Sequence, residues 1–472
     1  MNDKGNMDQG QVIQRQFSPV HTAGTEAHSS GAGGGYVLRI SVVAALGGLL
    51  FGYDTAIISG AIPFIRPYFH LDEYSLGWAV SSILIGCGAG AAAAGIAADR
   101  FGRRITLMLC ALLFALSGIG AGLSTGLSLF IVFRMAGGIG VGAAAIVSPL
   151  YIAETAPPDR RGRLVALYQL AIVAGILLAY LSNFILAGIG DSSWRWMFAS
   201  QALPSVLFGL MLLLVPETPR WLVKKGRLVE ARRILSKTMD PASCESTLGA
   251  IQDSFRNEGR AVWSELCSKK YLPVVTLGIF IAVFQQITGI NVVLYYAPVL
   301  FKDTGMDDSA SLLQTVGIGL VNVAATVISI TLVDRIGRKL LLKTGSGLMG
   351  LSLAAMALCF RYHYFQHYVI LCAMLVYVGA FGATWGAVAW VYLSEIFPNR
   401  IRGLAMSVAT LALWLADFIV TYTFPVMQAR AGNALTFSAY AVFCGAALIY
   451  VLVKIPETRG KSLEEMETLF LK

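Results

Sequence analysis

The sequence predicts an all-α membrane protein with twelve transmembrane helices. Of its 472 residues, 56% are hydrophobic and only 13% are charged, whereas soluble domains carry about 25% charged residues. Apolar runs long enough to cross a bilayer core of about 30 Å recur along the whole chain. Lys and Arg stand in short clusters between these runs, a pattern typical of membrane topology. The net charge of +9 therefore gives no reason to expect nucleic acid as a partner.

The individual helices follow from a length rule. An α-helix rises about 1.5 Å per residue, so roughly 20 apolar residues cross the hydrocarbon core. Residues 1–35 are polar and end in GAGGG, which predicts a disordered tail, and residues 456–472 form a second tail. Between the tails, the rule predicts spans at 36–64, 75–97, 105–124, 128–151, 164–189, 197–215, 272–300, 312–333, 340–359, 368–394, 403–428 and 435–455.

The segment 216–271, between spans six and seven, is expected at the membrane surface. It alternates Ala, Leu and Ile with Lys, Arg and Glu, a pattern of short amphipathic helices. Basic residues gather in this segment and in the loops after the even-numbered spans, and positive charge is retained in the cytoplasm. We therefore expect this segment and both termini on the cytoplasmic side. The short loops favour a bacterial inner membrane.

The sequence also repeats itself. Three motifs of the first half return in the second at separations of 235, 241 and 240 residues. This near-constant spacing predicts two six-helix halves, 36–215 and 272–455, in parallel, the build of a transporter that rocks around a site between its halves. The pairs are DRFGRR (99–104) with DRIGRK (334–339), YIAETAPPDRRG (151–162) with YLSEIFPNRIRG (392–403), and PETPR (216–220) with PETRG (456–460).

These repeated motifs resemble those of the sugar porters of the major facilitator superfamily, which include bacterial proton–xylose and proton–galactose symporters, plant monosaccharide symporters and facilitative glucose transporters. The resemblance runs from residue 47 to residue 465 and rests on the order and spacing of the motifs. It implies transport of a hexose or pentose, such as glucose or xylose, by alternating access. The other motifs that carry it are GGLLFGYDTAIISG (47–60), RMAGGIGVG (134–142), PETPRWL (216–222), QQITGIN (285–291) and PETRGKSLEE (456–465).

Charged residues near the expected cytoplasmic ends of the spans form one candidate site. Buried charge is costly unless it is paired, so we expect ion pairs that form when the inner gate is shut and separate when the halves rock. Ordinary surface ion pairs, which contribute little, are the alternative. The candidates for this gating network are Arg103, Arg104, Glu154, Arg161, Glu217, Arg338, Glu395, Arg402 and Glu457.

Amide and aromatic side chains inside the spans form a candidate sugar site. Each amide offers one acceptor and two donors, which matches sugar hydroxyl groups, and aromatic rings suit the apolar face of a sugar. Span seven holds Gln285, Gln286, Asn291 and Tyr295, with Gly289 positioned to loosen the helix. The alternative is that amides join helices and tryptophans mark packing. The resemblance implies sugar contacts at Gln169, Gln285, Gln286, Asn291 and Trp390, and Asn322 and Trp414 are further candidates.

Asp54 and Arg134 are two charges that should not lie inside a membrane. Their estimated depths are similar, about 15 Å and about 9 Å, and intramembrane charges usually pair. We expect that protonation of Asp54 frees Arg134 and couples sugar movement to protons, and the resemblance implies an acid at this position in proton-coupled members. Gln201 stands where some of those members carry a glutamate, which leaves facilitated diffusion open.

Two further departures from the family pattern bear on the substrate. Leu413 stands where several members have a glutamine that reaches the sugar, and Asp417 stands where they commonly have asparagine. Polyol or inositol transport, and sugar sensing without transport, also stay open. The chain shows no nucleophile–base pattern, metal-binding cluster or phosphate loop, so we expect no enzyme activity, cofactor or metal site. The expected partners are a monosaccharide, protons and the lipid bilayer, and we expect a monomer.

Overall fold

The computed structural model describes residues 32–157, 160–257, 263–364, 368–398, 400–459 and 465. Within these ranges the chain is helical and contains no strand. Most of the first expected tail, and residues 460–464 and 466–472 of the second, lie outside the described residues. The first helix begins at Ala32, inside the range that we expected to be tail, so residues 32–35 extend the helix of the first span.

Seven α-helices build the six crossings of the first half. The sixth crossing consists of two helices that meet at Gln201, and a short 3-10 segment, Ala187–Ile189, ends the fifth. The helices are α1 (Ala32–Tyr68), α2 (Glu73–Phe101), α3 (Arg103–Leu123), α4 (Leu127–Thr155), α5 (Arg161–Leu186), α6 (Ser193–Ser200) and α7 (Ala202–Leu213).

The second half contains two crossings that are each broken into two helices. Gly289, which has a φ of 90°, separates α12 from α13, and Thr384, with φ −130° and ψ −88°, separates α16 from α17. The helices are α12 (Leu272–Ile287), α13 (Ile290–Lys302), α14 (Asp308–Ile336), α15 (Arg338–Arg361), α16 (Val369–Ala383), α17 (Trp385–Ile396) and α18 (Arg402–Lys454).

The helix α18 contains two crossings. Its 53 residues would extend about 80 Å, far more than one bilayer core, and Gly432 within it has non-helical angles (φ 75°, ψ 165°). Eleven helical stretches of the described residues are long and apolar enough to cross a membrane, α18 being one of them. Counting its two arms separately gives twelve, so the prediction of an all-α fold with twelve crossings is confirmed.

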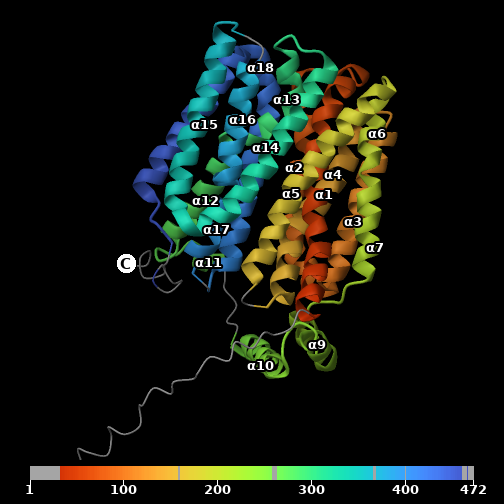
Figure 1. Cartoon of the computed structure of the whole chain (residues 1–472), viewed down its shortest axis with the longest axis vertical. Coiled ribbons are helices and arrows are strands. Elements are labelled where there is room, and N and C mark those ends of the chain that lie inside the picture. Colours follow the sequence, from red (N-terminus) through yellow and green to blue (C-terminus); the bar gives the residue numbers. More distant parts are fainter. Residues whose placement is uncertain are drawn as a thin grey trace, which may run out of the picture.

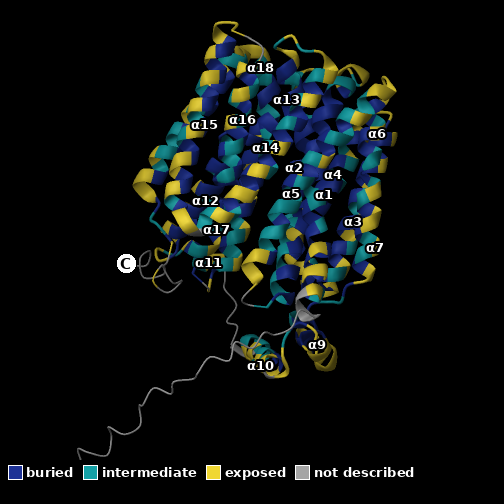
Figure 2. Ribbon diagram, in the orientation of Figure 1, coloured by how far each residue is buried: buried dark blue, intermediate teal, exposed yellow. Residues whose placement is uncertain are grey.

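The outer surface of the bundle is apolar and exposed. Leucines such as Leu112, Leu116 and Leu123 are 54%, 48% and 72% exposed, and Figure 2 shows exposed residues on the outside with buried residues through the middle. Soluble proteins rarely expose so large an apolar surface to water. This surface identifies a multi-pass membrane protein.

Four short helices link the two halves at one end of the bundle, the end that also carries the arginine-rich α2–α3 and α14–α15 turns. We call this the basic end, and the other the opposite end. In Figure 1 the second and third of these helices project below the bundle. As expected for segment 216–271, they are short and bury one face. They are α8 (Pro219–Lys224), α9 (Leu228–Leu235), α10 (Pro241–Asn257) and α11 (Trp263–Leu266).

Glycines allow the helices to approach each other closely. A Cβ atom added at Gly138 or Gly142 of α4 would collide with backbone carbonyl groups of α2, at Ile83 and Cys87. The glycine run of span four therefore serves close helix packing.

The two halves contact each other toward the opposite end. The hydroxyl of Tyr180 on α5 donates to the carbonyl of Leu294 on α13 at 2.8 Å. Gly77 of α2 lies against the backbone of Tyr422 on α18, and the Arg430 guanidinium donates to the Tyr74 hydroxyl. The structure therefore describes a state in which the halves are joined away from the basic end.

Candidate functional site

The breaks in the seventh and tenth crossings are joined by a hydrogen bond from an amide side chain. Gly289 adopts a left-handed conformation, which glycine accepts without strain, and the ring of Tyr440 lies against it. One turn earlier, Gln285 Nε2 donates to the carbonyl of Trp385 at 3.0 Å. That carbonyl belongs to the start of α17, beside the irregular Thr384. A side chain of one broken helix thus stabilises the other.

The amide groups of the seventh crossing form a connected cluster. Asn291 Nδ2 donates to Gln286 Oε1 at 2.9 Å, and Gln286 Nε2 lies 3.5 Å from Gln285 Oε1. Gln285 and Gln286 are buried, whereas Asn291 is partly exposed. Asn291 also contacts the carboxyl group of Asp417 on α18. These side chains present donors and acceptors at one place, which is the chemistry that recognises a polyhydroxylated molecule.

Two other predicted sugar contacts, Tyr295 and Trp414, lie on α13 and α18. Tyr295, one turn beyond Asn291, is buried and interacts electrostatically with Asp417. Trp414 of α18 stacks at a tilt on Phe51 of α1, with ring centroids 5.8 Å apart, and its buried indole N–H has no partner among the described residues. A buried donor without a partner is free to bind a ligand hydroxyl.

The remaining candidates are less closely connected. Asn322 of α14 is buried, with its amide oxygen beside Gly382 of α16. Gln169 of α5 and Trp390 of α17 are half-buried, and neither forms a side-chain hydrogen bond with the described residues. The structure thus groups Gln285, Gln286, Asn291, Tyr295 and Trp414 near Asp417, and it places the other three on neighbouring helices.

A buried ion pair lies in the first half. Arg134 Nη1 of α4 donates to Asp54 Oδ1 of α1 at 2.6 Å and to the Asp54 carbonyl at 3.0 Å. Both side chains are 0% exposed. The guanidinium also lies over the ring of Phe198, 5.5 Å from its centroid. The pair that the similar depths of Asp54 and Arg134 predicted is therefore present.

Small and polar residues surround this pair, but they leave some of its hydrogen-bonding atoms without a partner. A Cβ atom at Gly137 would lie 2.6 Å from Asp54 Oδ2, so only glycine leaves space for the carboxylate there. Gln201 lies beside Asp54. Asp54 Oδ2 and Arg134 Nη2 have no hydrogen-bond partner among the described residues. A buried pair with unsatisfied atoms is poised to rearrange.

At the basic end, the first half holds a compact charged cluster. Arg103 Nη2 donates to Glu154 Oε1 at 2.9 Å, and Glu154 accepts from the Thr218 hydroxyl at 2.6 Å. Glu217 accepts the backbone N–H groups of Arg103 and Arg104 at 3.1 and 3.0 Å. Glu217 thus caps the start of α3, where helix N–H groups lack partners.

The second half repeats this cluster bond for bond. Arg338 Nη2 donates to Glu395 at 2.8 Å, and Glu395 accepts from Thr458 at 2.6 Å. Glu457 accepts the backbone N–H groups of Arg338 and Lys339 at 2.9 and 3.0 Å. Each cluster therefore joins elements of its own half.

Three predicted network residues lie outside these ion pairs. Arg104 donates to the carbonyl groups of Leu212 and Leu213, and Arg402 donates to the carbonyl of Phe397. Neither forms an ion pair with a described residue. Arg161 is exposed and likewise has no ion pair among the described residues. Proximity in sequence does not fix side-chain direction, and at a helix end carbonyl groups compete with carboxylates for arginine.

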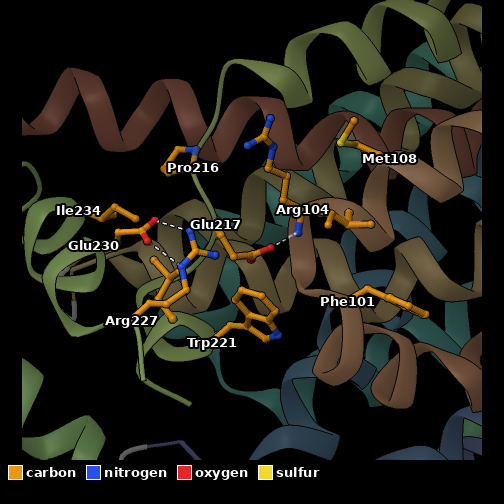
Figure 3. Close-up of a pocket in the computed structure, with 11 residues that line it drawn as sticks. Phe101, Arg104, Met108, Pro216, Glu217, Trp221, Arg227, Glu230 and Ile234 are labelled. Atoms are coloured by element: carbon orange, nitrogen blue, oxygen red, sulfur yellow. Dashed lines mark hydrogen bonds and ion pairs between the residues drawn. The ribbon is translucent and has the colours of Figure 1, made fainter. Parts of the chain in front are cut away.

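A cavity of about 470 Å³ lies at this end, between α3 and the linker helices. Figure 3 shows Glu217 near the middle of the lining residues, with Arg104 toward one side and the Arg227–Glu230 pair toward the other. Desolvation raises the pKa of Glu217, although the backbone N–H groups of Thr218, Arg104 and Arg103 oppose the shift. Glu217 is thus a partly buried acid beside water-accessible space.

Sequence reasoning missed the hydroxyl partners of the two clusters. Thr218 and Thr458 follow the glutamate in both copies of the P-E-T motif, so the repeat itself contained the signal. Two tyrosines were also missed: Tyr151 and Tyr392 donate to the carbonyl groups of Pro216 and Pro456, at 2.6 and 3.1 Å. No group of His, Cys, Asp and Glu among the described residues could hold a metal ion.

Two repeated six-helix halves, a buried charge pair and a polar cluster at broken helices together define a secondary transporter. The chain matches the family model "Sugar (and other) transporter" over residues 40–470. It therefore belongs to this family of membrane transporters, in agreement with the expected resemblance to sugar porters.

Individual relatives agree with this assignment. The D-xylose-proton symporter of Escherichia coli (strain K12) is 40% identical over 473 residues, covering 92% of this chain and 96% of that protein. The arabinose-proton symporter of Bacillus subtilis (strain 168) is 39% identical over 454 residues, covering 95% and 97%. The solved inward open conformation of the xylose transporter XylE from E. coli has a TM-score of 0.82 at 39% identity, covering 92% of this chain and all of that one.

Proposed function

We propose that this protein is a proton-coupled monosaccharide symporter of a bacterial inner membrane, with D-xylose as the first substrate to test. The observation that carries the proposal is the presence, in one bundle, of a buried Asp54–Arg134 pair and a connected amide cluster. The first supplies a proton acceptor, and the second supplies groups that bind hydroxyls. The two relatives described above are proton symporters of pentoses by name.

The sugar binds in this proposal between the amide cluster of α12 and α13 and the first arm of α18. Gln286 and Asn291 offer hydrogen bonds to hydroxyl groups, and the unpartnered indole N–H of Trp414 offers another. The ring of Trp414, with Tyr295 nearby, covers the apolar face of the sugar. Gln169, Asn322 and Trp390 complete the site from neighbouring helices when the halves close on the substrate.

The proton binds in this proposal at Asp54. While Asp54 is ionised, Arg134 Nη1 is held against it at 2.6 Å. A proton on the carboxyl group removes the charge attraction, so Arg134 is released to other acceptors and α1 is free to move relative to α4. Sugar and proton are then carried together because both favour the same arrangement of the halves.

The basic end is cytoplasmic in this proposal, with both termini on that side, because the arginine-rich loops gather there. The halves contact each other at the opposite end, which supports an inward-facing state. The high TM-score to an inward open structure supports the same reading. The charged clusters, each within one half, hold helix ends together as the halves rock. A monomer in the lipid bilayer is sufficient for this cycle.

One observation favours a second candidate, facilitated diffusion. Beside the buried pair stands Gln201, an amide that cannot pass a proton onward as a carboxyl group does. Without a second acid beside Asp54 among the described residues, Asp54 and Arg134 would then be a structural pair only. Uptake without proton coupling is the distinguishing property.

Uptake of radiolabelled sugar into proteoliposomes tests the proposal. D-xylose, L-arabinose, D-glucose and D-galactose are supplied with and without an inward proton gradient, and a protonophore is added at steady state. Symport predicts accumulation above the external concentration that the protonophore abolishes. Equilibration that ignores the gradient would establish facilitated diffusion, and uptake of none of the four sugars would overturn the assignment to monosaccharides.

A further inference from the structure

A second carboxyl group is buried inside the bundle, and the proposed transport cycle does not use it. Asp417 lies midway along the first arm of α18, between Arg402 and the break at Gly432. About 20 Å of helix separates it from either end of that arm. Its side chain is within the bundle, since the residue is only 1% exposed.

The neighbours of Asp417 are neutral. Thr421, one turn further along α18, donates to Asp417 Oδ1 at 3.0 Å. Asn291 of α13 contacts the same carboxyl group. The titratable groups that face it are Tyr295 of α13 and Cys87 of α2. No Lys, Arg or His of the described residues forms an ion pair with it.

Asp417 differs from Asp54 in having no basic ion-pair partner among the described residues. Asp54 is as deeply buried but has Arg134 at 2.6 Å. An ionised carboxylate taken out of water without a basic partner costs several kcal/mol, and two neutral hydrogen-bond donors offset only part of that cost. The environment of Asp417 therefore stabilises the neutral acid, and the group ionises when water reaches it.

We propose that Asp417 is a second proton-binding site, in the second half of the protein, whose protonation frees Asn291 to bind sugar. This inference rests on the proposed function for its effect on sugar, whereas proton binding by Asp417 is independent of it. Cys87 of α2 interacts electrostatically with both carboxyl groups, so both face the region around α2. Protons taken up at the two sites thus act on the same central region.

The mechanism follows from counting donors. Asn291 has two amide N–H groups, and one is committed to Gln286 Oε1 at 2.9 Å. A carboxylate at Asp417 can only accept, so it takes the second N–H and leaves none for sugar. A proton from solvent converts Asp417 to an acid that donates its O–H to the Asn291 carbonyl or to a sugar hydroxyl. One amide N–H then becomes available to the substrate.

The first test measures the proton directly. Infrared difference spectra of the purified full-length protein, recorded as pH is raised, report protonated carboxyl groups by their C=O stretch. A band present in wild type and absent from Asp417→Asn is expected. Asp303→Asn, at an exposed aspartate of the opposite end, is the control and keeps the band. A spectrum of Asp417→Asn identical to wild type would overturn the proton site whatever the protein transports.

The second test measures the effect on binding. Calorimetric titration with D-xylose and D-glucose is carried out across a range of pH in Asp54→Asn, so that Asp54 does not contribute. Affinity is expected to fall about tenfold as pH rises, the equivalent of one hydrogen bond. Asp54→Asn/Asp417→Asn is expected to keep the low-pH affinity throughout. An equal fall in both variants would overturn the role of Asp417 in sugar binding.

Discussion

The two halves of the protein are alike at the basic end and different in the membrane interior. At the basic end, Arg103 and Arg338 each donate to a glutamate of the following motif, at 2.9 and 2.8 Å. In the interior, the first half holds a charged pair and the second holds connected amides. The duplicated parts are those that both halves need in order to move as units. In the proposed cycle the parts that differ take different roles: the charged pair of the first half couples protons, and the amide cluster of the second half binds sugar hydroxyls beside the proposed proton site at Asp417.

Breaking the interior pair is expected to have the largest effect. Arg134→Ala leaves the Asp54 carboxylate buried without its partner, so the free energy of unfolding is expected to fall by about 3–5 kcal/mol. Thermal unfolding in detergent measures the loss. The double variant Asp54→Asn/Arg134→Gln, which removes both charges together, is expected to recover most of it. If Arg134→Ala were as stable as wild type, the pair would not hold α1 to α4.

The two basic-end clusters are expected to differ in how much each contributes to stability. The bonds match, but Glu154 is 6% exposed and Glu395 is 25% exposed. Arg103→Ala strands the more deeply buried carboxylate and is expected to cost about 3 kcal/mol, against about 1–2 kcal/mol for Arg338→Ala because water screens Glu395. Thermal unfolding of the two variants side by side gives the ranking. The reverse order would show that sequence repetition hides a functional difference between the clusters.

Sugar recognition is expected to depend mainly on the amide cluster of the second half, with Gln169 as the candidate from the first half. Gln286→Ala removes a buried amide that bonds to Asn291, so sugar affinity is expected to fall by about 10- to 100-fold, with little change in thermal stability. Calorimetric titration of the purified variant measures it. Gln428→Ala is the matched control, because that glutamine bonds to Asp303 at the exposed opposite end. Equal affinity losses in the two variants would contradict an amide-lined site.

The smallest expected effect is a dependence of stability on pH at Glu217. Burial raises the pKa of Glu217, so the folded state favours the protonated form more than the unfolded chain does. The stability from this group is complete below the unfolded pKa and is lost as pH rises through the folded pKa. Glu217→Gln should make the thermal unfolding midpoint less dependent on pH, measured across about pH 4 to 8. A variant with the same slope as wild type would show that Glu217 ionises freely.

Composition and spacing were sufficient to predict the twelve crossings, because the membrane imposes a length and polarity that each span must meet. The positions of two breaks were less accessible. Gly289 is a visible weak point, whereas the break at Thr384, with its irregular angles, was not predicted; its side chain lies against Gly345 of α15. The extra helical residues from Ala32 follow from continuation of the first span and not from hydrophobicity.

The candidate site was predictable where burial forces a pairing and less so elsewhere. Asp54 and Arg134 were expected to pair because an isolated charge in the membrane is too costly. The helix-end arginines had no such constraint, and Arg104 and Arg402 took backbone carbonyl groups instead. The sequence marked Asp417 as an acid in place of an amide that bears on the substrate, but it did not reveal the surroundings on which the proposed proton site rests. Its neutral surroundings became apparent from the packing of α13 against α18.

The division of work between the halves is tested most directly by Asp54→Asn in proteoliposomes. Two rates are measured in the same vesicles, exchange of labelled sugar at equal concentrations and accumulation driven by an inward proton gradient. The account predicts that exchange continues, because the amide cluster is intact, while accumulation above equilibrium is abolished. Accumulation at the wild-type level would contradict it, since Asp54 would then not carry the coupled proton.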